Sequence, residues 1–243
     1  MLAVPTGMHK GIYIALSGAV LKQGQLDLLS NNIANANTVG FKKSRSSFKE
    51  HLLSRLSGTP ESDDGRAMSD LSAVRNDFSE GNHFKTGNPL DVALDGNGFF
   101  SLEGGRYTRK GDFRVSGDGY LIAQGGRKVL GAKGPIKLPP GKADITTSGD
   151  VRVDGKPVDT LKIVSFGNTD SLVQLEDSQF TTDMKPAKSN AVAMSGNLEA
   201  SNVYVVKEMV QLLATMREFE SYQKVIQAFD DAASRVNNEM ARI

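Results

Sequence analysis

The sequence contains no cysteine and no tryptophan, and it has neither an excess of one charge nor a long apolar run. Without cysteine, disulfides, cysteine nucleophiles and thiolate metal sites are excluded. Lys and Arg total 29 against 28 for Asp and Glu, so the net charge of +1 provides no basic excess for nucleic-acid binding. No apolar segment approaches the roughly 20 residues of a membrane-spanning helix. Residues 11–20 are the only candidate core of a signal peptide, and they merge into a helical pattern, so we expect no cleaved leader.

The last forty residues carry apolar side chains at helical spacing. Steps of four and three residues separate them, with a doubled three-step from Met216 through Phe219 to Tyr222. The pattern predicts one helix over 203–243, roughly 60 Å long, with a narrow apolar face as in a coiled coil. The doubled step predicts a stammer that tightens the supercoil. The apolar positions are Val205, Met209, Leu212, Met216, Phe219, Tyr222, Ile226, Phe229, Ala233, Val236, Met240 and Ile243.

A second apolar stripe near the N-terminus predicts another helix, roughly 40 Å long and ending near Ile33. Two such helices at the two ends predict a parallel or antiparallel pair with the rest of the chain inserted between them. Packing on the chain's own domain is one alternative. The other is packing between subunits, which is favoured because a 60 Å helix exceeds the roughly 35–40 Å of a compact domain. The N-terminal stripe consists of Met8, Ile12, Ala15, Ala19, Leu26, Leu29 and Ile33, with Lys22 as its interruption.

The residues after the first helix predict how it ends. Four Asn residues lie within 31–37, and Gly40-Phe41 follows. Asn and Gly tolerate the left-handed conformation that closes a helix, so we expect a positive φ at Gly40 and Phe41 packed on the last turn. Phe48 begins a segment, 48–56, that predicts another helical turn or two. Together, residues 1–56 are then the N-terminal helix with its Asn-rich exit, and 57–84 are a polar linker.

From Val74 the apolar period changes to two. Two hairpins are predicted, one turning at Gly104-Gly105 and one over 116–119. We therefore expect an all-β module over 85–170, an irregular return over 171–202 and the long C-terminal helix over 203–243. The fold class is α+β: long N- and C-terminal helices form a coiled-coil-like pair, with an inserted all-β module.

Motifs for catalysis or cofactor binding are weak, so we expect no enzyme, no cofactor and no metal. Residues 95–98 resemble a calcium loop but lack the later Glu, and no Gly-x-Ser-x-Gly elbow exists. A peptidoglycan-binding module needs an aromatic platform, whereas Tyr107 and Tyr120 are isolated. A peptidoglycan-cleaving enzyme stays open as an alternative, because paired carboxylates could come from Asp91, Asp95, Glu103, Asp112 and Asp118.

Three segments resemble the bacterial flagellar rod and hook proteins. Residues 30–42 resemble the N-terminal signature of that family, with Ile33 in place of its usual Leu. Residues 90–100 and 107–113 resemble the family's β-domain, and 199–203 resemble its C-terminal segment. The N-terminal motif positions are Asn31, Asn32, Ala34, Asn35, Thr38, Gly40 and Phe41.

The resemblance implies an axial subunit of the flagellar basal-body rod, which crosses the periplasm. Such a subunit would be exported through the flagellar type III apparatus without cleavage, with Met8 as an alternative start. Its partners would be other rod subunits and the export apparatus, with no nucleic acid, small-molecule substrate or membrane insertion. Residues 129–131 and 134–136 favour a proximal over a distal rod subunit. The expected assembly interface is Ile12, Ala19, Leu26, Leu29, Ile33, Val205, Met209, Leu212, Met216, Phe219, Tyr222, Ile226, Phe229, Val236 and Met240.

Overall fold

The computed structural model describes residues 6–50 and 69–240 of the chain, and side chains within 11–46 and 74–235. The chain divides into two compact units. The helical unit comprises 1–33, 44–75 and 205–243, and the β unit comprises 34–43 and 76–204. The chain therefore passes between the units four times.

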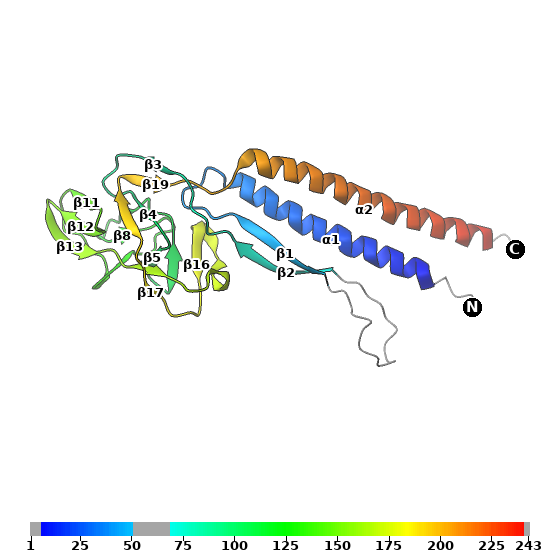
Figure 1. The fold of residues 1–243 in the computed structure, drawn as a ribbon, viewed down its shortest axis with the longest axis horizontal. Coiled ribbons are helices and arrows are strands. Elements are labelled where there is room, and N and C mark those ends of the chain that lie inside the picture. The colour runs from blue at the N-terminus through cyan, green and yellow to red at the C-terminus, as the bar shows by residue number, and fades with distance from the viewer. Residues whose placement is uncertain (1–5, 51–68, 241–243) are drawn as a thin grey trace. The chain divides into compact units, whose positions relative to one another are not determined.

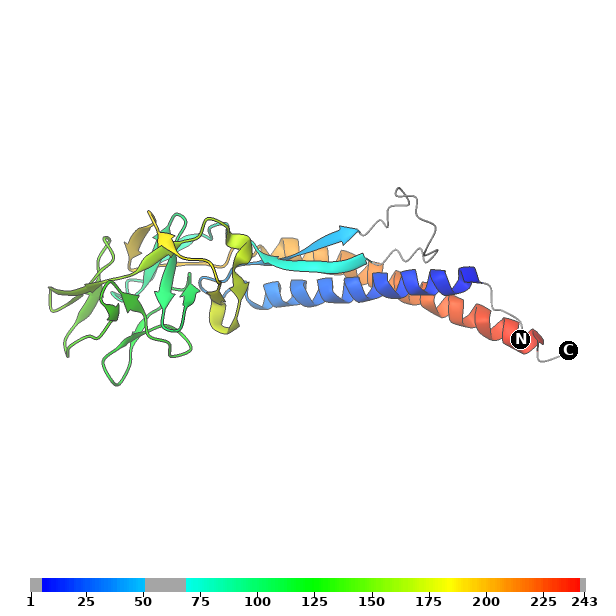
Figure 2. The ribbon, with the colours of Figure 1, turned by 90° about the horizontal axis from the view of Figure 1, so that it is seen from below.

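Two long helices dominate the helical unit. Helix α1 spans Thr6–Ala34 and helix α2 spans Val205–Met240, with 29 and 36 residues. At 1.5 Å per residue they extend roughly 43 and 54 Å. They run side by side in opposite directions, which identifies the pair as antiparallel (Figures 1 and 2). The predicted terminal helices and the α+β class are confirmed; residues 241–243 lie outside the described part.

Contacts between the helices fix one register. They pair Asn32 with Glu208, Lys22 with Glu218, Gly18 with Tyr222, and Gly11 with Phe229. The two residue numbers add up to 240 in every pair, as a constant antiparallel register requires. A Cβ atom added to Gly18 would lie 2.5 Å from the Tyr222 ring, so the ring packs directly on the backbone of α1.

The buried face of α2 corrects the predicted stripe. Met209 and Met216 are exposed, whereas the neighbouring Glu208 and Thr215 are buried. With these two polar residues the inward positions follow an uninterrupted three-four repeat, so the predicted stammer is wrong. The wrong prediction arose because only apolar residues were counted, so Met209 and Met216 were taken in place of the buried Glu208 and Thr215. The repeat is Val205, Glu208, Leu212, Thr215, Phe219, Tyr222, Ile226, Phe229 and Ala233.

The residues of α1 that face α2 complement those of α2 in size. Small residues come first, at Gly11, Ala15 and Gly18, opposite the aromatic part of α2. Longer and polar residues follow, at Lys22, Gln25, Leu29 and Asn32. Large side chains on one helix thus fill the space left by small ones on the other, which permits close packing.

Strands β1 (Ser44–Glu50) and β2 (Ser69–Asn76) form a two-stranded sheet in the helical unit. The helical turn expected from Phe48 is therefore wrong over 48–50, and residues 51–56 lie outside the described part. Phe48 is the only apolar residue of β1, so the segment has no helical stripe to bury. The expected linker over 57–84 also contains β2, and its residues 57–68 are not described.

The largest sheet of the β unit has six antiparallel strands in the order β15-β16-β6-β5-β14-β17. The predicted hairpin around Gly104-Gly105 is confirmed, with Ser101 opposite Tyr107. The strands are β5 (Phe99–Leu102), β6 (Arg106–Thr108), β14 (Ile163–Ser165), β15 (Val173–Gln174), β16 (Gln179–Thr181) and β17 (Ala187–Lys188).

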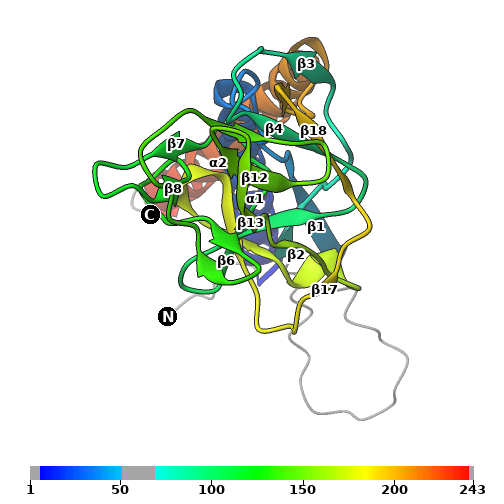
Figure 3. The ribbon, with the colours of Figure 1, turned by 90° about the vertical axis from the view of Figure 1, so that its left-hand side faces the viewer.

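Smaller sheets complete the β unit, and the second predicted hairpin is confirmed as β7 and β8. Figure 3 shows β4 beside β18 and β12 beside β13. The pairs are β3 (His83–Lys85) with β19 (Asn197–Glu199), β4 (Val92–Asp95) with β18 (Val192–Ser195), β7 (Arg114–Val115) with β8 (Leu121–Ile122), and β9 (Leu130–Gly131) with β10 (Gly134–Pro135). The three-stranded sheet is β11 (Ala143–Ile145), β12 (Asp150–Val153) and β13 (Lys156–Thr160).

The segment 171–202, expected to be irregular, contains strands β15–β19 and a short 3-10 helix, Glu176–Ser178; another, Thr169–Ser171, begins just before it. These strands have two to four residues and no apolar alternation. They form because they pair with distant strands, such as β16 with β6 and β19 with β3.

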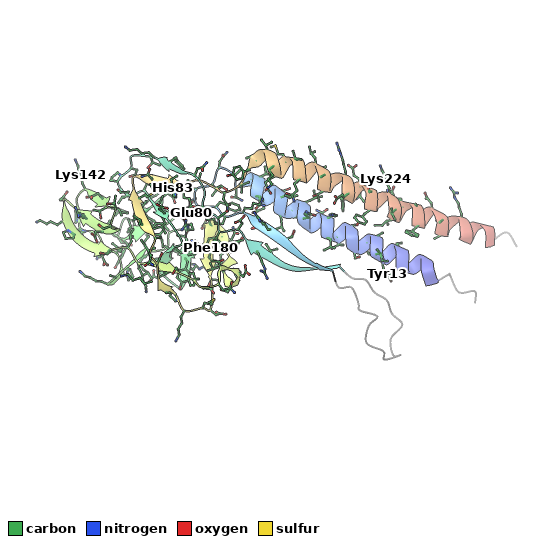
Figure 4. The ribbon with its side chains drawn as sticks, in the orientation of Figure 1. Tyr13, Glu80, His83, Lys142, Phe180 and Lys224 are labelled. Carbon is green, nitrogen blue, oxygen red and sulfur yellow. The ribbon has the colours of Figure 1, made fainter. Side chains whose placement is uncertain are left out.

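Two apolar cores lie on opposite sides of β5. Successive side chains of a strand point to opposite faces, so Phe100 joins one core and Phe99 the other. Phe100 packs edge-on against Phe113 at 5.0 Å between ring centroids. Phe180, labelled in Figure 4, lies in the second core with Phe99. Each fully buried ring contributes on the order of 1.5–3 kcal/mol.

We expect Gly18→Leu to destabilise the helical unit by about 1–3 kcal/mol, because the new side chain overlaps the Tyr222 ring. Leucine has the higher helix propensity, so a loss of stability isolates the packing effect. The measurement is thermal and urea unfolding followed by far-UV circular dichroism. Gln23→Leu, at an exposed position of α1, is the control. Adding Tyr222→Ala to Gly18→Leu should recover part of the lost stability, because it removes the ring that overlaps the leucine. If Gly18→Leu were as stable as the control, the register of the two helices would be contradicted.

Candidate assembly surface and the junction of the signature segments

The expected interface residues mostly face inward within one chain. Tyr222 and Phe229 lie against Gly18 and Gly11 of α1. Met209 and Met216 are exposed, and the side chains of Val236 and Met240 lie outside the described part. The others are buried or half-buried: Ile12, Ala19, Leu26, Leu29, Ile33, Val205, Leu212, Phe219 and Ile226.

A second set of apolar residues lies on the outer faces of the two helices. The outer face of α1 consists of Tyr13, Leu16 and Val20, and the outer face of α2 of Val206, Val210 and Leu213. At 100° per residue, both sets lie opposite the side on which the helices touch. Their side chains are 50–76% exposed. Sequence reasoning missed them, although each is a short three-four series out of phase with the main stripe.

Exposed apolar residues in such a cluster mark an interaction surface. Met209 and Met216, which flank the outer face of α2, are exposed as well. The surface available to partners therefore lies on the far sides of the pair, and the predicted stripe largely joins α1 to α2.

Asn32 shows why the first signature contains asparagine. Its amide nitrogen donates to the Ser44 carbonyl, and its amide oxygen accepts from the Ser44 N–H, both at 2.9 Å. The side chain thereby acts like one residue of a neighbouring strand at the start of β1. It is 1% exposed and also donates to Glu208 at 3.4 Å. This one amide joins α1, β1 and α2.

The rest of that signature forms the exit segment, residues 34–43, which belongs to the β unit. Ala34 ends α1, and exposed Asn31 precedes it. The Thr38 N–H and hydroxyl donate to the Asn35 carbonyl and side-chain oxygen, both at 3.1 Å. Phe41 is buried, and its N–H donates to the Thr38 carbonyl.

Gly40 brings the other two signatures together. Its φ is +64°, as predicted. Its N–H donates to the Glu199 carbonyl at 2.8 Å, and an added Cβ would lie 2.7 Å from the Lys110 backbone. Because Lys110 belongs to the middle signature and Glu199 to the C-terminal one, only glycine fits where the three segments meet.

A buried ion cluster lies at the same place. The Glu199 carboxylate accepts from Lys42 Nζ at 2.6 Å and from Arg109 Nε at 2.9 Å. The three side chains are at most 3% exposed. The Gly81 N–H donates to the carboxylate at 3.0 Å, and Lys42 donates to the Ser79 carbonyl. Each of the three signature segments supplies one charge, a grouping that sequence reasoning missed.

Electrostatics within the cluster favour the ionised carboxylate. Burial acts to raise the pKa of Glu199, but the charges of Arg109 and Lys42 outweigh it and hold that pKa below its ordinary value. Burial lowers the pKa of Lys42, and its attraction to Glu199 opposes this only in part. Removing one partner of a buried pair leaves an uncompensated charge, which is costly.

Asn202 closes the junction. Its side-chain oxygen accepts from the Lys43 N–H at 2.8 Å, and its amide nitrogen donates to the Asp77 carbonyl at 2.7 Å. The Asp77 N–H in turn donates to the Lys43 carbonyl at 2.8 Å. Each of these three residues lies in the β unit, next to a different point at which the chain passes to the helical unit. The hydrogen bonds therefore hold three separate stretches of the β unit together.

The acids considered for catalysis have structural surroundings. Asp91 accepts from the Thr86 hydroxyl and the Asn88 amide at 2.7 and 2.8 Å. Asp112 lies across a β-bridge from Asp91, and burial raises its pKa against the effect of Lys110. The remaining three are exposed: Asp95 at the end of β4, Glu103 at 3.8 Å from Lys128, and Asp118 in the β7–β8 turn.

Tyr107 and Tyr120 form no aromatic platform. Tyr107 packs edge-on against Phe166 with ring centroids 4.8 Å apart, and Lys128 lies 4.4 Å above the Tyr120 ring. Among the described residues, no three acidic or histidine side chains form a metal-binding group. In the same part of the chain, no helix is long and apolar enough to cross a membrane.

Three family models match this chain, and each covers one residue of the buried ion cluster. "Flagella basal body rod protein" matches residues 12–42 and "Flagellar hook protein FlgE/F/G D1 domain" matches 93–155. "Flagellar basal body rod FlgEFG protein C-terminal" matches 194–239.

Curated relatives match almost end to end. The flagellar basal-body rod protein FlgG of Agrobacterium fabrum is 31% identical, over 95% of this chain and 99% of its own length. FlgF of Escherichia coli is 32% identical over 95% and 98%. FlgF of Caulobacter vibrioides is 32% identical over 90% and 93%.

The family models define the class: a structural subunit of the bacterial flagellum, not an enzyme. Within that class, the chain belongs to the flagellar basal-body rod proteins. The rod of the flagellar basal body is therefore its location. The predicted family is confirmed.

We expect Gly40→Val to lower the free energy of unfolding of the β unit by about 2–5 kcal/mol, from the left-handed backbone and the overlap with Lys110. Urea unfolding of the full chain measures it. Gly87→Val is the matched control, because φ is +76° there but no atom lies within 4 Å of the added Cβ. Equal losses for the two variants would show that the close approach contributes nothing.

We expect Glu199→Gln to cost about 3–5 kcal/mol at neutral pH, because Lys42 and Arg109 lose their shared counter-charge. A carboxyl whose pKa is lowered by folding stabilises the fold above its ordinary value of 4.5 and loses that contribution as pH falls. The difference between wild type and variant should therefore shrink in acid.

Lys42 does not change how stability depends on pH in the acid range where Glu199 titrates. A lysine whose pKa is lowered by folding reduces stability wherever the unfolded chain keeps it protonated, which holds at every pH well below 10.5. Urea unfolding across the acid range is the measurement. Glu103→Gln, which breaks an exposed pair with Lys128, should change stability by less than about 1 kcal/mol. If the difference in stability between wild type and Glu199→Gln did not change with pH, folding would not lower the pKa of Glu199, and the ionised cluster would be refuted.

Proposed function

We propose that this chain is a self-assembling axial subunit of the proximal rod, similar to FlgF, and that it transmits torque from motor to hook. The observation that carries the proposal is the pair of exposed apolar outer faces on two long terminal helices. A distal, FlgG-like position is the alternative, and identities of 31% to FlgG and 32% to FlgF do not separate the two.

We propose that α1 and α2 act as a coiled-coil-like pair in the rod. The seven-residue repeat and the constant register support this reading. Buried polar residues at repeat positions, here Glu208 and Thr215, fix register at some cost in stability. A pair of defined register presents its outer faces at fixed positions along its length, which an ordered assembly requires.

Assembly would bury the outer faces between subunits. Each apolar side chain that becomes buried contributes on the order of 1.5–3 kcal/mol before the costs of association. Many long helices packed along their length would resist twisting, because each is braced by its neighbours. In the free subunit the same faces are exposed, which favours association before assembly. We propose that the chain is exported through the flagellar type III apparatus without cleavage.

The proximal position rests on resemblance over 129–131 and 134–136, which contain the paired strands β9 and β10. Peptide mass spectrometry on hook–basal bodies from the source organism tests it, with spectral counts referred to the hook protein. Presence at low copy number supports the proximal rod, and clearly higher copy number favours the distal rod. Absence from well-preserved basal bodies would refute the proposed function.

We expect Val210→Asp to abolish incorporation into the rod, because it puts a charge in the middle of the α2 outer face. The free chain should keep its stability, since Val210 is 64% exposed. Motility and the recovery of the chain in basal bodies are the measurements. Gln211→Asp, one residue away and off that face, should leave both unchanged. Normal rods containing Val210→Asp would count against an assembly role for the face.

A further inference from the structure

The two outer faces match each other in spacing. On α1, steps of three and four residues separate Tyr13, Leu16 and Val20. On α2, steps of four and three separate the members of its face. Antiparallel alignment therefore places all three residues opposite partners: Tyr13 with Leu213, Leu16 with Val210, and Val20 with Val206. The residue numbers of every such pair add up to 226.

These faces cannot cover each other within one chain. Each lies on the side of its helix that points away from the other helix. Figure 4 shows Tyr13 on the side of α1 remote from α2, and Lys224, which lies on the same side of α2 as its outer face, remote from α1. The register inside the chain gives a sum of 240, so Leu16 lies at the level of residue 224 rather than Val210. A second copy of the chain is the occupant that presents the matching spacing.

We propose that the α1 outer face of one subunit binds the α2 outer face of the next, with a fixed stagger along the helices. The sums of 240 within a chain and 226 between chains differ by 14 residues, which is two heptads and roughly 21 Å. Because the shift is a whole number of heptads, the helices keep their rotational phase. The inference rests on the proposed function and specifies which surfaces meet.

The contact is heterologous, because its two sides are different residues. A heterologous contact with an axial shift does not close into a dimer, and its repetition builds an open helical array. Antiparallel self-pairing of the α1 face fits less well, since it brings Leu16 opposite Ser17, whose hydroxyl already donates to the Ile14 carbonyl at 2.9 Å.

Disulfide cross-linking tests this contact, because the chain has no cysteine of its own. Leu16→Cys and Val210→Cys are combined in one chain, which replaces the native protein in cells, and basal bodies are purified and oxidised. We expect a ladder of dimers, trimers and longer species that collapses on reduction. Each single variant should give monomer, and the two single variants expressed together should give dimer but no ladder.

The register has a matched control. Arg217 lies one heptad beyond Val210 on the same exposed side of α2, so Leu16→Cys with Arg217→Cys should give no ladder. If the Arg217 pair links and the Val210 pair does not, the stagger is overturned. If either single variant forms dimers, the contact is isologous and the proposal fails. Should the first pair reduce incorporation, Val20→Cys with Val206→Cys tests the same register with smaller changes.

The outcomes also separate the two proposals. Absence of the unmodified chain from basal bodies refutes the proposed function. Its presence together with unlinked Leu16→Cys/Val210→Cys chains, and unlinked Val20→Cys/Val206→Cys chains, refutes only this contact.

Discussion

The β unit depends on one buried carboxylate. Glu199 lies between Lys42 and Arg109, and these three charges come from three different signature segments. Transferring three ionised groups out of water is expensive, so the arrangement is stable only while all three are in place and their hydrogen bonds are satisfied. Gly40 allows the close approach that brings the segments together, and the side chain of Asn202 connects two neighbouring stretches of chain through hydrogen bonds to the Lys43 N–H and the Asp77 carbonyl. Segments far apart in the sequence are thereby fixed at one point.

The helical unit is held together by packing and polar contacts between its two helices. Small residues of α1 receive aromatic rings of α2, and polar residues such as Asn32 and Glu208 lie at repeat positions nearer the start of β1. Packing fixes how close the helices lie, while the polar contacts fix their register. Because the inward side is used within the chain, the apolar residues left over lie on the outer faces. An assembly subunit needs both properties: a pair of fixed register and a surface that remains available.

Periodicity predicted the long helices, the α+β class and two β hairpins, because each depends on local spacing and turn residues. The Asn- and Gly-rich residues after the first helix predicted the positive φ of Gly40. Periodicity failed at β1, at the strands over 171–202 and at the stammer. Strands such as β16 and β19 have no apolar alternation and exist because distant strands pair with them. Glu208 and Thr215 were passed over because burial of a polar residue depends on its neighbours in space, which spacing alone does not reveal.

The sequence by itself determined the family, the terminal helices and the residues of the signature segments, since these are local patterns and long, specific motifs. Tertiary structure alone decided what those residues do. It brought Lys42, Arg109 and Glu199 into one cluster, and it turned the main apolar stripe inward and a shorter one outward. The physical reason is that helical spacing specifies which residues share a face, whereas the packing of one helix on another decides which face remains exposed.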